Sequence, residues 1–335
     1  MTPDDLPLAD ISPPSILLAA LALNLVLCSA GRLSSVFAWP ATMAGRLIQT
    51  FEARYNRPHA TDAMRRADSV SIAIVLVILA LGVGLGFHVL LRGFPYGWLV
   101  EAAFISILLN IRPHLERMRI LAHAARDGGE EARATLSLLT SRDACDGDVA
   151  SICTAGIESA AMVLTQGLMG PVLWYLIGGL PALLVFKMID TASTMIDERS
   201  ENARSFGWAP RCLSALLLFP ASILAAPIVV IAALLVPGAH ARIRGVFSGR
   251  RGRYAWPVFT PVIAAFAAVL GVRLGGPVCI GSFRRAGTFF GPDRKATLGD
   301  LWRARSLFIA AGLVVAALLA LLPGLAGDVT GFFDF

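Results

Sequence analysis

Long apolar segments alternate with polar, arginine-rich segments along almost the whole chain. A membrane-spanning helix needs about 20 mainly apolar residues. Four segments meet or approach that length without interruption, and we expect each to cross a membrane: residues 15–30, 70–91, 96–111 and 306–322. The pattern predicts an all-α, polytopic integral membrane protein in which residues 1–335 form a single membrane domain.

Three further apolar segments are interrupted by proline. They are residues 160–186 (Pro171 and Pro181), residues 213–236 (Pro220 and Pro227) and residues 258–272 (Pro261). Interrupted helices are tolerated at membrane depth where protein buries them or where they line a cavity. We therefore expect these segments to be broken or re-entrant helices.

The composition favours the same class of protein. Of the 335 residues, 56% are hydrophobic and 16% are charged, whereas soluble domains have roughly 45–50% apolar and about 25% charged residues. The formal net charge is +6, but no polar segment combines a Lys/Arg cluster with interleaved aromatic residues. Nucleic acid is therefore not an expected partner, and the lipid bilayer is.

The basic residues indicate how the segments are oriented, because cytoplasmic loops collect Lys and Arg. Arginines gather in residues 32–66, in residues 112–142 and in the basic segment 239–304, which also contains the third broken stretch. Both ends of the chain are acidic and lack basic residues, so we expect both to face outward, with an even number of crossings. Seven crossings would place the basic stretch 284–295 outside and are disfavoured. The predicted location is a bacterial inner membrane, with any active face cytoplasmic.

Residues 112–158 are predicted to form a cytoplasmic excursion built on an amphipathic helical hairpin. Its first helix has an apolar stripe of Ile111, Leu115, Met118, Ala122 and Ala125, beside a polar flank of Arg112, Glu116, Arg119, His123 and Arg126. One interpretation is an interfacial hairpin with a solvated polar face. The other is a lid whose arginines contact an anionic substrate.

Residues 187–211 form a polar segment of acids, bases and small hydroxyl side chains between two apolar stretches. A solvated helix face would explain opposite charges at i,i+3 spacing, such as Lys187 with Asp190 and Glu201 with Arg204. The alternative is a site in which carboxylates hold Mg²⁺ and basic side chains bind phosphate.

Glu158 is a separate candidate, because it directly precedes the first broken apolar segment. We expect it at the mouth of a membrane cavity. An ionisable side chain is costly to bury in such a place and is a functional candidate by default.

Many of these residues recur as parts of one larger pattern. Its central block contains Arg142-Asp143, Ile157-Glu158-Ser159, Gly167, Pro171, Trp174, Gly178-Gly179, Pro181, Lys187, Thr191, Met195, Glu201, Arg204 and Phe206-Gly207-Trp208-Ala209. The outer blocks contain Pro40 with Gly45 and Leu270-Gly271, Arg273 and Gly275-Gly276-Pro277. The pattern covers nearly the whole chain and resembles the CobD/CbiB family of cobalamin biosynthesis.

The resemblance implies an adenosylcobinamide-phosphate synthase, a membrane ligase. Such an enzyme joins the carboxylate of adenosylcobyric acid to aminopropanol phosphate in an amide bond, driven by ATP with Mg²⁺. The matching positions imply Glu158, Lys187 and Glu201 as catalytic residues, Glu158 and Glu201 as metal or amine ligands, and Arg142, Lys187 and Arg204 as phosphate contacts. The implied partners are the two substrates, with a second copy of the chain or other enzymes of the pathway as candidate protein partners.

The chain also departs from the family pattern, which leaves two hypotheses open. Met162, Val163 and Gln166 stand where the family usually shows acidic and amide side chains, and Asp190 and Ser193 replace an Asn and an Asp. The first hypothesis is a divergent synthase. The second is a relative without catalysis that acts as a membrane scaffold, a corrinoid binder or a sensor, by analogy with the related AmpE signalling family. A transporter is a weaker third reading, since no inverted repeat is evident.

Overall fold

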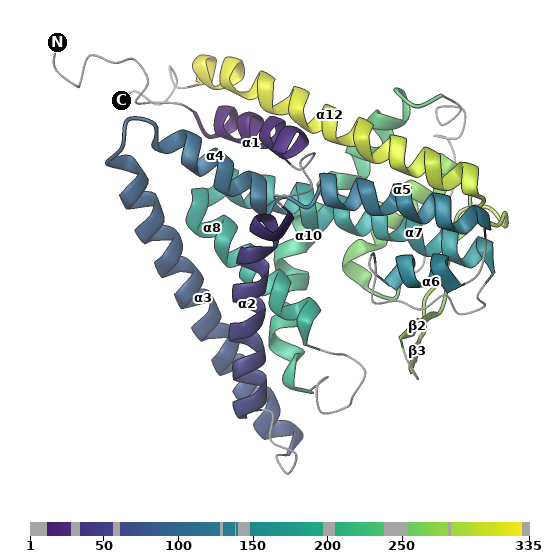
Figure 1. Cartoon of the computed structure of the whole chain (residues 1–335), viewed down its shortest axis with the longest axis horizontal. Coiled ribbons are helices and arrows are strands. Elements are labelled where there is room, and N and C mark those ends of the chain that lie inside the picture. Colours follow the sequence, from purple (N-terminus) through teal and green to yellow (C-terminus); the bar gives the residue numbers. More distant parts are fainter. Residues whose placement is uncertain are drawn as a thin grey trace.

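The fold is built almost entirely from helices. The computed structural model describes residues 12–27, 34–55, 61–127, 130–137, 139, 148–196, 205–237, 254–280 and 283–329. The helices are α1 (Pro13–Leu27), α2 (Ser34–Tyr55), α3 (Asp62–Arg92), α4 (Gly97–Leu108), α5 (Arg112–Asp127), α6 (Glu130–Ser137), α7 (Val149–Val163), η3 (Leu164–Met169), α8 (Gly170–Met195), α10 (Trp208–Ala233), η5 (Pro257–Phe259), α11 (Thr260–Leu270) and α12 (Leu298–Val329). Their arrangement is shown in Figure 1.

Within the described ranges, four helical stretches are long and apolar enough to cross a membrane. They are α3, the run Val149–Met195 that comprises α7, η3 and α8, then α10, and residues Leu298–Leu322 of α12. The predicted all-α polytopic membrane fold is therefore confirmed, with four candidate membrane-spanning stretches among the described residues. Large apolar side chains on α3 that point away from the protein include Ile74, Ile78, Val83 and Val89. Such a surface suits lipid.

Two of the four predicted spans are not among these stretches. In the described part of the chain α1 has 15 residues and α4 has 12, and 12 residues extend only about 18 Å, against a hydrocarbon core of roughly 30 Å. The chain leaves helical geometry at Leu109, where ψ is 130°. The buried Asn24 side chain of α1 then donates to the carbonyls of Ser106 (2.7 Å) and Leu109 (3.2 Å). Hydrogen bonds from Asn24 thus compensate the early end of α4.

The first proline-containing segment is a re-entrant hairpin, as expected, but the break is at glycine. Gly178 (φ −145°, ψ 24°) and Gly179 (φ 62°, ψ −155°) leave helical geometry inside α8. Gly170 then lies against the ring of Phe186, so the chain doubles back after the two glycines. The first limb is α7, η3 and α8 up to the turn, and the second limb is the rest of α8.

The second proline-containing segment is not broken. Pro220 and Pro227 both lie inside the continuous helix α10, and our expectation of a broken or re-entrant segment is wrong there. Proline is tolerated within helices at membrane depth, where neighbouring helices and local adjustments satisfy the freed backbone groups. α10 packs against α8, α11 and α12.

The third segment forms the short, almost wholly buried α11. Pro261 lies in its first turn, where a missing N–H costs nothing, and Gly271 ends the helix in the left-handed conformation (φ 62°). Two small antiparallel pairs follow, in which β1 (Leu274–Gly275) pairs with β4 (Phe289–Phe290) and β2 (Val278–Ile280) pairs with β3 (Phe283–Arg285).

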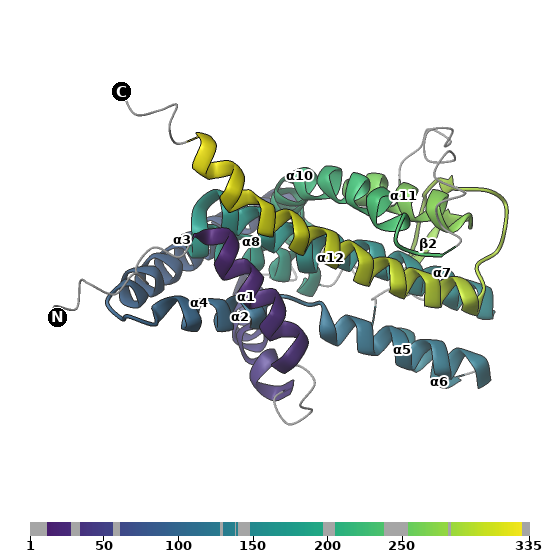
Figure 2. The same ribbon diagram turned by 90° about the horizontal axis from the view of Figure 1, so that it is seen from above.

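The amphipathic hairpin is present as the contacting pair α5 and α6. Its predicted apolar stripe is buried against the core throughout, as the members Ile111, Leu115, Met118, Ala122 and Ala125 show. Figures 1 and 2 place this hairpin with the amino ends of α7 and α12 on one side of the molecule. The α3–α4 connection and the carboxyl end of α12 lie on the opposite side.

Candidate functional site

The re-entrant hairpin places three polar side chains together. Gln166 on the first limb donates from its side-chain amide to Asp190 Oδ1 on the second limb (3.3 Å). Lys187 Nζ donates to the backbone carbonyl of Gln166 (3.2 Å). We call Gln166, Lys187 and Asp190 the Lys187 cluster. All three are partly buried, so an ammonium, a carboxylate and an amide meet within an apolar helical body.

A π-helical turn shapes the first limb at this point. In η3 the Gly170 N–H bonds to the carbonyl of Thr165, five residues back. The carbonyls of Gln166 and Gly167 accept from donors outside the helix, which are Lys187 Nζ and the Asn110 N–H (3.3 Å). Single π-turns inside α-helices recur at functional sites. Here the turn presents backbone oxygen to a lysine.

Hydroxyl side chains fix the second limb beside the cluster. Thr191 Oγ1 donates to the carbonyl of Lys187 (2.7 Å), and Ser193 Oγ donates to the carbonyl of Asp190 (2.8 Å). These bonds stay within the helix. The hydroxyl groups of the polar segment therefore support the local backbone.

Glu158 lies elsewhere and is fully buried, with 0% of its surface exposed. Tyr254 Oη donates to Glu158 Oε2 (2.5 Å), and the Gly275 N–H donates to Glu158 Oε1 (2.7 Å). The carboxylate thus joins α7 to the segments that flank α11. The expected position of Glu158 at the mouth of a cavity is therefore wrong. Hydrogen bonds to a charged carboxylate of this kind are among the stronger ones.

The structure does not join Glu158 and Lys187 in one site. Gln166 follows Glu158 by eight residues on the same helical run, a rise of about 12 Å. Arg142, Glu201 and Arg204 lie outside the described residues, so their positions stay predictions.

The described residues offer little for a metal ion. Within the described ranges no three His, Cys, Asp or Glu side chains are grouped so as to hold one. Both Glu158 oxygens already accept hydrogen bonds from the fold, so this carboxylate does not fit the role of a Mg²⁺ ligand. Of the two predicted metal ligands, Glu158 and Glu201, only Glu201 stays a candidate. Among the described residues, Asp190 is the carboxylate beside Lys187.

A second network, in which Asp300 is buried and Arg294 is partly exposed, closes the end of α11. Arg294 donates to the carbonyls of Gly271 (2.8 Å) and Leu270 (3.1 Å) and forms an ion pair with Asp300 (2.9 Å). The hydrogen bond to Asp300 raises the pKa of the Arg294 guanidinium. This network explains the carboxyl-terminal motif as a structural element, because Arg294 satisfies carbonyls that the helix end leaves free.

Three polar residues that make buried or partly buried contacts are not predicted by the sequence patterns. Gln166 enters those patterns only as a departure from the family, and Tyr254 does not enter them. Glu101 on α4 accepts from Tyr175 Oη (2.9 Å), and both side chains are buried. Glu101 is the one acid of the apolar segment 96–111. An ionisable residue inside such a segment indicates a function or a buried partner.

Comparison with known proteins gives a consistent result. Residues 17–308 match the family described as CobD/Cbib protein. The cobalamin biosynthesis protein CobD of Sinorhizobium sp is 32% identical over 291 residues, which cover 83% of this chain and 88% of that protein. The protein of the same name from Rhizobium meliloti (strain 1021) is 32% identical over 80% of this chain and 84% of its own length. The one from Pelobacter propionicus is 28% identical over 92% of this chain and 94% of its own length. No solved structure matches the chain.

Proposed function

The chain belongs to the CobD/CbiB protein family, and from this premise we propose that it is a ligase of cobalamin biosynthesis. The proposed reaction condenses the carboxylate of adenosylcobyric acid with the amino group of aminopropanol phosphate. Cleavage of ATP takes up the elements of water that amide formation releases, and the product is adenosylcobinamide phosphate. The relatives named above support a role in cobalamin biosynthesis in general.

The Lys187 cluster is the observation that carries the proposal. An ammonium held against a helical carbonyl, 3.2 Å from the Gln166 oxygen, keeps donors for a phosphate or carboxylate oxygen of a substrate. A charged side chain is costly to place in such an apolar setting, so Lys187 is a functional candidate by default. We propose that Lys187 binds the phosphate that develops during activation and that Asp190 accepts a proton from, or orients, the incoming amine.

Gln166 has a positioning role in this proposal. Its backbone carbonyl accepts from Lys187 and its side-chain amide donates to Asp190, so it fixes the distance between Lys187 and Asp190. The family pattern has other polar groups near this position, and here a single glutamine makes both contacts. Positioning of reacting groups is a large part of ligase catalysis, because ordering is provided before the reaction begins.

A second candidate function is a relative of these enzymes that binds a corrinoid without catalysis. Two observations favour it. Met162 and Val163 replace polar family residues, and Glu158 has both oxygens occupied within the fold. In this case the Lys187 cluster would bind an anionic side chain of the corrinoid.

We propose that the protein lies in a bacterial inner membrane with its active face on the cytoplasmic side. The basic loops support this orientation, since α5, α6 and the basic amino end of α12 lie together (Figure 2). The proposal places the phosphate-bearing substrates where nucleotide is available.

The direct test uses the purified protein in lipid nanodiscs with adenosylcobyric acid, aminopropanol phosphate, ATP and Mg²⁺. We expect adenosylcobinamide phosphate by mass spectrometry, and at least a hundred-fold lower rate for Lys187→Ala. The matched control is Lys295→Ala, which changes the other lysine of the chain, an exposed residue paired with Asp148. Corrinoid binding without any product from the unaltered protein would reject the ligase and favour the second candidate.

A further inference from the structure

Helix α5 carries a row of three basic side chains on its exposed face. Arg119, His123 and Arg126 are all exposed, and their spacing of four and three residues places them on one side of the helix. The opposite side of α5 is packed into the core through the buried apolar stripe that includes Leu115 and Met118. The row is therefore held on a helix that is fixed to the protein body.

Helix α12 adds two side chains to this row. The rings of Trp302 and His123 meet edge to face, with 5.6 Å between their centroids. The Arg305 guanidinium lies 5.9 Å from the centroid of the Trp302 ring, within the range of a cation–π contact, and it donates to the Leu115 carbonyl of α5 (3.4 Å). The two helices pack against each other (Figures 1 and 2). We call these five side chains the Trp302 patch: Arg119, His123, Arg126, Trp302 and Arg305.

The Trp302 patch carries positive charge that the protein does not neutralise. The ion pairs of the described part of the chain include neither Arg126 nor Arg305. Arg119 pairs with Glu116 (2.8 Å), but these two side chains are 54% and 43% exposed, and an ion pair at such a surface contributes little. The patch therefore attracts an anionic ligand.

A line of exposed side chains leads from the patch along α12. Trp302, Ser306, Ile309 and Leu313 follow helical spacing and share one face of the helix. The side chains of Ile309 and Leu313 are 37% and 59% exposed. Both lie within the stretch Leu298–Leu322, which is apolar enough to cross a membrane. Lipid chains can therefore lie along α12 directly beside the patch.

The length of this stretch places the patch at the level of the lipid headgroups. Its 25 residues extend about 38 Å, whereas the hydrocarbon core measures roughly 30 Å. Its charged residues, Asp300, Arg303 and Arg305, all lie near its amino end, so this end is the one that reaches beyond the hydrocarbon. Tryptophan is enriched at this level of membrane proteins, which agrees with the position of Trp302.

We propose that the Trp302 patch binds the phosphate headgroup of an anionic phospholipid. Arg119, Arg126 and Arg305 supply charge-assisted donors to the phosphate oxygens, and the acyl chains lie along Ile309 and Leu313. A soluble phosphate would use the charges but not the apolar line. A zwitterionic lipid carries a cation of its own, which the arginines repel. The proposal depends on the membrane fold and not on the proposed ligase.

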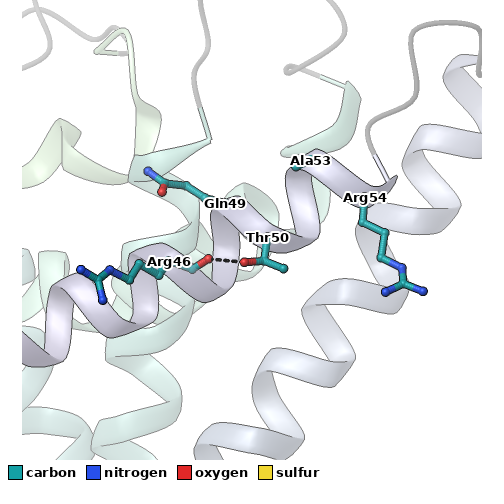
Figure 3. Close-up of a pocket in the computed structure, with 5 residues that line it drawn as sticks. All are labelled: Arg46, Gln49, Thr50, Ala53 and Arg54. Carbon is teal, nitrogen blue, oxygen red and sulfur yellow. Dashed lines mark hydrogen bonds between the residues drawn. The ribbon is translucent and has the colours of Figure 1, made fainter.

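A second basic surface of the protein lacks these features. The hollow on α2 is lined by Arg46, Gln49, Thr50, Ala53 and Arg54 (Figure 3). These lining residues include two arginines but no aromatic and no large apolar side chain. The α2 surface therefore provides a control that has a similar charge and no support for lipid chains.

The test titrates the full protein in detergent with phosphatidylglycerol or with phosphatidylcholine and counts bound lipids by native mass spectrometry. Arg119→Gln and Arg126→Gln should each raise the dissociation constant for phosphatidylglycerol about five-fold, because each removes one cation next to an anionic headgroup. Binding of phosphatidylcholine should stay unchanged. The matched controls are Arg54→Gln on α2 and Arg92→Gln at the far end of α3, both at exposed positions, and they should leave both constants unaltered.

Each outcome decides the proposal. Weakening of phosphatidylglycerol binding by the two α5 substitutions alone supports it, whether or not the protein makes adenosylcobinamide phosphate. Equal affinity of the unaltered protein for the two lipids would overturn it, as would equal weakening by Arg54→Gln, which would show a general effect of surface charge. Glycerol 3-phosphate serves as a competitor without acyl chains. If it displaces the lipid at concentrations near the lipid's own dissociation constant, the patch is a site for a soluble anion and the proposal is overturned.

Discussion

At the scale of single residues, the sequence identified charged positions but not their partners. Lys187 and Glu158 stood out because both adjoin apolar segments. The partners of Glu158, Tyr254 and the Gly275 backbone, follow it by 96 and 117 residues, and no local spacing connects them. Both oxygens of Glu158 accept hydrogen bonds from the fold, whereas Lys187 donates to the backbone oxygen of Gln166.

The Glu158 interaction gives a stability prediction. Tyr254→Phe removes a hydrogen bond to a buried carboxylate, and we expect a loss of about 1.5–3 kcal/mol. Thermal unfolding of the detergent-solubilised protein should show a lower midpoint. Tyr96→Phe, at an exposed tyrosine, should leave the midpoint unchanged. Equal midpoints for the two variants would show that the bond contributes nothing.

His114 gives a prediction about pH. Its side chain is 1% exposed and lies beside Phe308, and burial, with help from the charge of Arg117, lowers its pKa from 6.5 to about 3. The folded protein keeps His114 neutral where the unfolded chain takes up a proton, so stability is full above about pH 6.5 and falls as the pH drops toward 3.

The measurement is the unfolding midpoint between pH 7 and pH 4. His114→Leu should flatten the pH dependence relative to the unaltered protein. His123→Leu changes an exposed histidine of the same helix and should keep the original slope. Identical slopes for all three proteins would contradict the assignment to His114.

At the scale of elements, the sequence predicted three broken segments, but the second is a continuous helix and the first breaks at a different residue type than expected. Proline marked all three segments, yet α10 runs through two prolines and the re-entrant turn occurs at Gly178 and Gly179. A proline removes one hydrogen bond that neighbours can replace, whereas the backbone of Gly179 is accessible essentially to glycine alone. The sequence could not show the Lys187 cluster for the same reason. Gln166 and Asp190 are 24 residues apart, and the fold of the hairpin brings them together.

The turn can be tested by a single methyl group. Gly179 has φ 62° and ψ −155°, and Gly179→Ala should cost about 1–3 kcal/mol for the strained conformation. Thermal unfolding should show a lower midpoint. Gly82→Ala is the control, since nothing lies within 4 Å of a Cβ added there, and it should not destabilise. A midpoint for Gly179→Ala that matches the control would argue against the turn.

At the scale of the whole molecule, composition and hydrophobic pattern predicted the class, because it depends on summed apolar length. The pattern also identified two of the four candidate spans, in α3 and α12, but not the other two. α4 ends early at a point that depends on the side chain of Asn24 from another helix, and sequence length alone cannot register such a contact.

The orientation also belongs to this scale. In the proposed orientation the α3–α4 connection lies outside and the end of α5 lies in the cytoplasm. A membrane-impermeant maleimide should label Phe94→Cys in cells with a permeabilised outer membrane, and should label Arg126→Cys only after the inner membrane is opened. Both positions are exposed, and the unaltered chain gives the background from its own cysteines. The opposite labelling pattern would invert the proposed topology.

Growth of a bacterial strain that lacks adenosylcobinamide-phosphate synthase, under conditions that require cobalamin, tests the proposed ligase in the cell. We expect the unaltered chain and Lys295→Ala to restore growth, and Lys187→Ala not to restore it, at equal amounts of membrane-inserted protein. No growth from the well-expressed unaltered chain, or full growth with Lys187→Ala, would contradict a ligase built around the Lys187 cluster.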